Sequence, residues 1–218
     1  MSTYRIKYQT IEFTHQDIHI KTLRDRQQYA DPDGVAAAFG ISSAQWPLFG
    51  VVWESSQVLA RILDDKDTRG LRILEVGCGI GLSSLLLNAR HEDITATDHH
   101  PMAGEFLLSN TALNDGEVIP FLRTGWDNQH TGLGRFNLIV GSDLLYETEH
   151  IHLLSQFIKQ HAKPNCEVII VDPGRGLHSK FSKAMTTLGF AHSQTNAPNE
   201  DPASEPFKGK ILRYLSGE

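Results

Sequence analysis

The chain is poor in cysteine, in basic residues and in long hydrophobic runs. It has 218 residues but only two cysteines, Cys78 and Cys166, too few for a disulfide framework or a four-cysteine zinc site. Lys and Arg number 20 against 26 Asp and Glu, a formal charge of −6, which argues against a protein built mainly to bind phosphate backbones. No apolar run reaches the roughly 20 residues that span a bilayer, and residues 1–10 lack the apolar core of a secretory signal. We therefore expect a soluble, cytoplasmic, reduced protein.

The remaining composition is that of a folded globular protein, with 40% hydrophobic and 21% charged residues. In residues 4–23 apolar and polar side chains alternate with a period of two, which predicts two or three short antiparallel strands in a ribbon. Turn residues follow at 31–34, and residues 34–50 suggest a loop or a short helix. We divide the chain into an N-terminal ribbon with a cover loop, residues 1–50, and a main domain, residues 51–218.

After residue 51 the pattern changes to an alternation of helices and short apolar strands. Strands are predicted at 71–76, 94–97, 118–122, 136–140 and 168–171, each followed by a helix or a loop. Several of these strands are almost entirely apolar, which indicates burial on both faces and therefore a parallel, doubly wound sheet. A polar, proline-containing loop at 196–206 precedes a last strand at 211–215, which suits an antiparallel hairpin at the edge of the sheet.

The most informative stretch is I-L-E-V-G-C-G-I-G-L at residues 73–82. It predicts a buried strand that runs into a glycine loop and then a helix, where backbone N–H groups can face a ligand. The spacing of Gly77, Gly79 and Gly81 is G-x-G-x-G and not the dinucleotide fingerprint G-x-G-x-x-G, which disfavours a dehydrogenase. Cys78 occupies a place that needs a small residue, so its backbone matters more than its thiol.

Two acidic residues narrow the choice of ligand. Glu75, in the strand, suits a cationic group better than a pyrophosphate, and Asp98, at the end of the next strand, is placed to accept hydrogen bonds from ribose hydroxyls. The predicted ligand has a ribose, no pyrophosphate and a positive amino-acid-like end. S-adenosylmethionine has all three properties.

These motifs resemble those of the seven-β-strand (class I) methyltransferases, over roughly residues 46–215. The segment W-P-L-F-G-V-V-W-E at 46–54 and S-D-L-L-Y at 142–146 are similar to the tryptophan segment and the D-x-x-Y motif of the lysine-methyltransferase-like group. That group includes protein lysine methyltransferases and nicotinamide N-methyltransferase-like relatives. The resemblance implies a mostly parallel, seven-stranded Rossmann-like sheet that binds S-adenosylmethionine.

The resemblance also implies roles for single residues. Trp126 would stack on adenine, Trp53 would lie at the methionine end, His99 would border the adenosine, and the backbone of Ser142 would lie beside the cofactor. Trp126 as ordinary core and Trp53 as part of an apolar helix face remain alternatives. The predicted cofactor-binding residues are Trp53, Glu75, Gly77, Cys78, Gly79, Gly81, Asp98, His99, Trp126 and Ser142.

Asp143 and Tyr146 are the predicted catalytic residues. Their spacing of three would place both on one side of a helical turn at the end of the fourth strand, where Asp143 attracts and orients a lysine and Tyr146 supplies an aromatic wall. An N-cap Asp with a packed Tyr is the alternative. No metal is expected, because the pairs His99–His100 and His15–His19 offer only two ligands each.

The sequence therefore predicts a monomeric S-adenosylmethionine-dependent methyltransferase that modifies a lysine side chain of a protein. The rivals are a small-molecule N-methyltransferase and a catalytically idle cofactor-binding module. Methylation of nucleic acid is disfavoured by the acidic charge and by the absence of an N-P-P-Y or D-P-P-Y motif.

Overall fold

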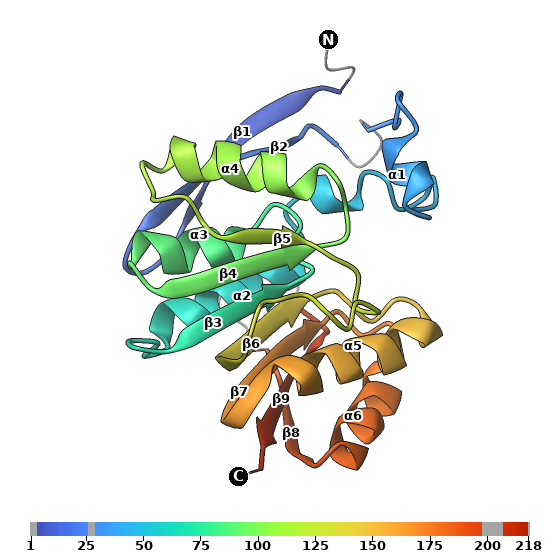
Figure 1. The fold of residues 1–218 in the computed structure, drawn as a ribbon. Helices are drawn as coiled ribbons and strands as arrows, with labels where there is room; N and C mark the ends of the chain where they lie inside the picture. The colour runs from blue at the N-terminus through green and yellow to red at the C-terminus, as the bar shows by residue number, and fades with distance from the viewer. Residues whose placement is uncertain (1–3, 26–28, 198–206, 218) are drawn as a thin grey trace.

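A seven-stranded sheet forms the centre of the computed structural model, which describes residues 4–25, 29–197 and 207–217. The strand order is β5-β4-β3-β6-β7-β9-β8 (Figure 1). The parallel strands are β3 (Arg72–Val76), β4 (Asp93–Asp98), β5 (Phe121–Arg123), β6 (Phe136–Ser142) and β7 (Ala162–Asp172). This architecture confirms the predicted mostly parallel, doubly wound α/β sheet.

Helices cover both faces of the sheet because the central strands are apolar on both sides. In β6 the side chains of Leu138 and Val140 belong to one buried cluster, and Ile139, between them, belongs to the other. The first cluster lies under α2 (Glu54–Asp65), α3 (Leu82–Ala89) and α4 (Ala103–Leu113), and the second lies under α5 (Thr148–His161) and α6 (His178–Thr187). Because successive side chains of a strand point to opposite faces, one apolar strand contributes residues to both buried clusters.

The C-terminal hairpin is antiparallel, as predicted, but β9 (Lys210–Ser216) lies between β7 and the edge strand β8 (Phe190–Asn196). The sequence analysis missed β8, because only Phe190 of its residues is buried and no alternation marks it. It also placed the third strand of the main domain too early. Val118 is 73% exposed and Pro120 has no N–H for pairing, so β5 begins at Phe121.

The N-terminal ribbon is the predicted antiparallel pair, β1 (Ile6–Glu12) and β2 (Asp17–Leu23). Helix α4 pairs with its edge through two asparagines. Asn110 Oδ1 accepts from the Lys21 N–H at 2.7 Å while its Nδ2 donates to the Lys21 carbonyl at 3.2 Å. Asn114 makes the same two bonds with His19, at 2.8 and 2.6 Å. Two asparagines four residues apart along the helix thus reach two strand residues that are two positions apart.

The buried face of the ribbon shares a core with the main domain. Ile11, Ile18 and Ile20 lie in the same cluster as α2, α3 and α4. Between the ribbon and α2 lie α1 (Val35–Ala38) and the 3-10 helix η1 (Leu48–Gly50). The division of the chain at residue 50 stays a prediction.

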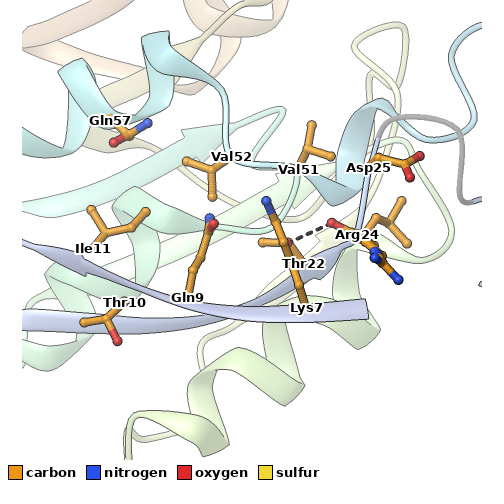
Figure 2. A pocket seen from close by; sticks show the side chains of 11 residues that line it. Lys7, Gln9, Thr10, Ile11, Thr22, Arg24, Asp25, Val51, Val52 and Gln57 are labelled. Carbon is orange, nitrogen blue, oxygen red and sulfur yellow. Dashed lines mark hydrogen bonds between the residues drawn. The ribbon is translucent and has the colours of Figure 1, made fainter. Parts of the chain in front are cut away.

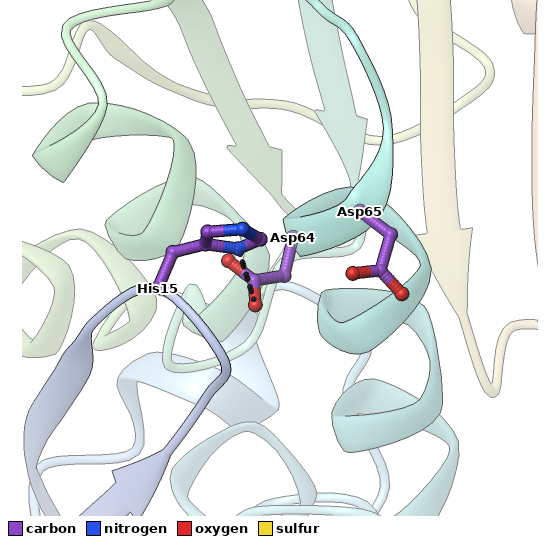
Figure 3. Close-up of side chains that lie close together, drawn as sticks. All are labelled: His15, Asp64 and Asp65. Carbon is purple, nitrogen blue, oxygen red and sulfur yellow. Dashed lines mark ion pairs between the residues drawn. The ribbon is translucent and has the colours of Figure 1, made fainter.

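The turn of the ribbon is held against the C-terminal end of α2. Asp64 Oδ2 accepts from the Thr14 N–H at 3.0 Å and lies 3.2 Å from Nδ1 of His15, with Asp65 nearby (Figure 3). His19 faces elsewhere, with its ring 2.9 Å from the hydroxyl of Thr10, so the two ribbon histidines do not converge. Within the described part of the chain, no helix has the length and apolarity to cross a bilayer.

Candidate functional site

A cavity of about 540 Å³ lies at the carboxyl ends of β3, β4, β5 and β6. We call it the strand-end cavity. It lies where the strand order reverses between β3 and β6, which is the usual ligand position in an open α/β sheet. Most of the predicted site residues line it, namely Trp53, Gly77, Cys78, Gly79, Asp98, His99, Trp126, Ser142, Asp143 and Tyr146. Two predicted residues, Glu75 and Gly81, are outside its lining.

The glycine loop between β3 and α3 adopts a backbone that side chains would strain. Gly77, Gly79 and Gly81 have φ angles of 61°, 56° and 78°, in the left-handed region. A Cβ added at Gly79 would lie 2.9 Å from the carbonyl oxygen of Phe49, which is backbone and cannot turn away. The Cys78 N–H bonds to the Thr97 carbonyl at 2.9 Å, so the loop is fixed to the end of β4.

Glu75 faces α3 and not the cavity. Strand periodicity puts its side chain on the same face of β3 as Ile73, under the first turn of the helix. Its carboxylate accepts from the Ser84 N–H at 2.9 Å and from the Ser84 hydroxyl. Burial raises the pKa of Glu75 to about 7, against the opposing effect of these hydrogen bonds. Its described contacts are those of a residue that fastens helix α3 to β3.

Asp98 is positioned by backbone donors at the rim of the cavity. Its Oδ2 accepts from the Gly79 N–H and its Oδ1 from the His100 N–H, both at 2.7 Å. Burial raises the pKa of Asp98, and these two N–H groups act in the opposite direction. Each carboxylate oxygen has a further lone pair, so a pair of hydroxyls can still bind.

Aromatic side chains form much of the cavity wall. The ring of His150 lies edge-to-face between Trp126, at 5.2 Å, and Tyr146, at 4.9 Å. Trp53 precedes α2 and donates from Nε1 to the Leu48 carbonyl at 2.9 Å. His99 lies on the other side, with Nε2 3.0 Å from the Phe39 carbonyl. The cavity lining therefore includes several rings that can pack against a planar ligand.

Asp143 and Tyr146 do not lie on a helical turn, which corrects the sequence analysis. They lie in the connection between β6 and α5, which begins only at Thr148. Asp143 has a φ of 55°, which a helical turn excludes, and its N–H bonds to the Val171 carbonyl at 2.9 Å. Hydrogen bonding to β7 therefore overrides the local helical spacing. Burial raises the pKa of Tyr146 to about 12, so the phenol stays neutral.

Arg175 holds the carboxylate of Asp143 in a two-pronged ion pair. Nε donates to Oδ1 at 2.9 Å and Nη2 to Oδ2 at 2.8 Å. The side chain of Asp143 is 10% exposed and that of Arg175 is 46% exposed, so the pair lies at the mouth of the cavity. Such a fork fixes the plane of the carboxylate and offsets its charge.

Sequence reasoning gave no role to Arg175, His150 or Gln45, which also line the cavity. Arg175 follows β7 by three residues, so its position after a strand was the available indication. Gln45 belongs to the cover loop and donates to Glu147 at 2.6 Å, a contact across 102 residues that no local pattern reveals. Residues 39–41, 45, 48 and 49 line the cavity as the cover loop was expected to do, whereas none of the described residues of β1 and β2 does.

Comparison with known sequences agrees with this geometry. A profile of the lysine methyltransferase family matches residues 45–187, which include the glycine loop, Asp98, Trp126 and the Asp143–Tyr146 segment. The chain belongs to the lysine methyltransferase family.

Two curated relatives of this family show the extent of the similarity. A calmodulin-lysine N-methyltransferase of Arabidopsis thaliana is 29% identical over 157 residues, which are 66% of this chain and 51% of that protein. Protein N-lysine methyltransferase METTL21A of Danio rerio is 28% identical over 139 residues, 59% of this chain and 63% of that protein. The chain thus spans between about half and two thirds of the length of these relatives.

Solved structures share the fold at low sequence identity. A 16S rRNA methyltransferase of T. Thermophilus, in complex with AdoMet and guanosine, has a TM-score of 0.70 at 13% identity, covering 97% of this chain and 50% of its own. Magnesium protoporphyrin IX methyltransferase of Synechocystis has a TM-score of 0.57 at 21% identity, covering 75% of this chain and 78% of its own. At these identities the likeness concerns the fold.

Proposed function

We propose that this protein transfers a methyl group from S-adenosylmethionine to a lysine side chain of another protein. One observation carries the proposal. The glycine loop with Asp98, and the pair Asp143–Tyr146, line the same cavity at the switch point of the sheet. Family membership and the lysine-methylating relatives support the same activity.

The lining of the strand-end cavity offers groups that suit S-adenosylmethionine. Asp98 would hold the ribose hydroxyls, Trp126 would cover the adenine, and the backbone of the glycine loop would lie beside the methionine end. The cofactor supplies an electrophilic methyl group on a positively charged sulfur. The protein orients the acceptor and excludes water, since direct transfer needs no covalent bond to the enzyme.

The pair Asp143–Arg175 would meet two opposing requirements: the acceptor lysine must be bound, and its amine must also lose a proton. A lysine must lose its proton before it attacks, and its ordinary pKa of about 10.4 makes this costly at neutral pH. A bare carboxylate beside it would raise that pKa further. Because Arg175 offsets the charge of Asp143, the carboxylate can orient the amine without holding its proton strongly. Tyr146 adds an aromatic wall next to this ion pair.

We also propose that the enzyme acts as a monomer in the cytoplasm, without a nucleic-acid partner. The net charge of −6 supports the last point, because phosphate backbones are bound by basic surfaces. Light scattering on the purified protein tests the first point.

The test of the activity is methyl transfer from tritiated S-adenosylmethionine into lysate of a strain that lacks the gene. Label in a protein band, assigned to lysine by mass spectrometry, is the expected result. Asp98→Asn should abolish it by weakening cofactor binding. Label only in small molecules would refute the protein acceptor, and cofactor binding without any transfer would indicate an idle module.

A further inference from the structure

A second cavity, of about 470 Å³, lies between the N-terminal ribbon and the start of α2. We call it the ribbon crevice. The side chains of Lys7, Gln9 and Thr22 point from the ribbon toward Val51 and Val52 (Figure 2). Val51 lines both this crevice and the strand-end cavity, so the two spaces share a wall.

The two cavities carry opposite charge. Among the described residues, the strand-end cavity is lined by four carboxylates and one guanidinium, a formal charge of 1 − 4 = −3, from Asp98, Asp127, Asp143, Glu147 and Arg175. The charged residues of the described lining of the ribbon crevice are Lys7, Arg24 and Asp25, a formal charge of 2 − 1 = +1, in a chain whose net charge is −6. Lys7 and Arg24 are both exposed.

We propose that the ribbon crevice binds acidic side chains that neighbour the acceptor lysine on the substrate protein. The proposal rests on the proposed function and names the class of substrate. The ammonium group of the lysine is drawn to the negative cavity, while carboxylates beside it are drawn to Lys7 and Arg24. The opposite arrangement is repelled at both places, so charge sets the orientation of docking.

An acidic protein segment fits this surface better than nucleic acid does. Among the residues that the structure describes, two basic side chains line the crevice, whereas backbone binding relies on many phosphate contacts. The neighbouring strand-end cavity would repel phosphates, because its lining is negative. The side-chain amide of Gln9, which also lines the crevice, has N–H donors that suit carboxylates.

The test uses the full chain. The acceptor is first identified as the protein band that the enzyme labels in lysate, and it is then purified for kinetic measurements. The variant Lys7→Glu/Arg24→Glu reverses both charges of the crevice. The matched control is Lys180→Glu/Lys183→Glu, which makes the same charge change on exposed positions of α6. Calorimetry with S-adenosylhomocysteine checks that each variant still binds the demethylated cofactor.

At low salt the crevice variant should raise the KM for the acceptor about tenfold, with kcat and cofactor affinity unchanged, while the control stays within twofold of wild type. The KM of wild type should rise with salt more steeply than that of the crevice variant. The methylated lysine should have acidic neighbours in sequence or on the adjoining surface. An unchanged KM in the crevice variant, or label in nuclease-sensitive material, would overturn the proposal. No protein band with wild type would instead refute the proposed function itself.

Discussion

The ion pair between Arg175 and Asp143 gives the sharpest prediction for the reaction. The substitution Arg175→Gln removes the positive charge and leaves the carboxylate of Asp143 unpaired at the cavity mouth. The acceptor amine then faces a bare negative charge, which stabilises its protonated form. Because only the neutral amine attacks, the acid limb of the pH profile of kcat, which reports groups in the enzyme–substrate complex, should move to higher pH.

The size of the shift follows from Coulomb's law. A carboxylate about 6 Å from the amine interacts by about 0.7 kcal/mol in bulk water and about 3 kcal/mol at an effective dielectric constant of 20. At about 1.36 kcal/mol per pKa unit these limits correspond to roughly 0.5 and 2 units. Arg175 is 46% exposed, so solvent screens part of the effect. We therefore expect a shift of about one unit in the acid limb of kcat and a loss of about tenfold in kcat at pH 7.

The assay is initial-rate methylation of the purified acceptor between pH 6 and pH 10, with both the cofactor and the acceptor saturating, so that the rate reports kcat. Arg175→Lys keeps the charge and should keep the position of the acid limb. Arg69→Gln is the matched control, because Arg69 makes a similar fork to Asp67, at 2.8 Å twice, outside the lining of the strand-end cavity. A uniform loss of kcat at every pH, with an unmoved acid limb, would refute the electrostatic role and leave only a structural one.

Three further predictions concern stability and cofactor binding. The raised pKa of Glu75, about 7 against an ordinary 4.5, means that the folded state holds this proton more tightly, so stability should fall by about 3 kcal/mol as pH rises from 4.5 to 7. In thermal melts at several pH values, Glu75→Gln should reduce the fall of stability with pH. An equal slope of stability against pH in wild type and variant would contradict the prediction. Gly79→Ala should lower Tm more than Gly70→Ala, because both glycines have positive φ but a Cβ added at Gly79 would lie 2.9 Å from the carbonyl oxygen of Phe49, whereas one added at Gly70 meets no atom within 4 Å; equal losses of Tm would show that this close contact does not destabilise the variant. Trp126→Ala should weaken S-adenosylhomocysteine binding by about 1–3 kcal/mol, and Trp126→Phe by much less, as measured by calorimetry; unchanged affinity in both would place Trp126 away from the adenine.

The sequence alone predicted the elements whose patterns are local. The apolar strands, the helices between them and the glycine loop each depend on neighbouring residues, so periodicity and turn chemistry were enough. The convergence of Gly79 and Asp98 also followed, because the carboxyl ends of adjacent parallel strands meet at one edge. The edge strand β8 was not predicted, because an exposed strand lacks a hydrophobic pattern.

What the sequence did not predict depends on which way a side chain points and on distant pairing. Glu75 was expected to face the ligand, but the pleat of β3 turns it under α3, where Ser84 binds it. Arg175 and Asp143 are 32 residues apart and meet only because β6 and β7 end side by side. The left-handed backbone at Asp143 likewise reflects its bond to Val171 and not its local sequence.

The side-chain amides of Asn110, in α4, and Asn114, directly after it, hold the edge of β2. A side-chain amide has the same donor and acceptor as a peptide group, so Asn110 and Asn114 behave like two residues of a missing neighbouring strand. A slip of one residue would turn Ile18 and Ile20 out to water, and it would also present to both amides residues whose N–H and C=O groups point away from the helix. The asparagines and the isoleucines therefore specify the same face of the ribbon, so a change of register by one residue would lose the polar and the apolar contacts together.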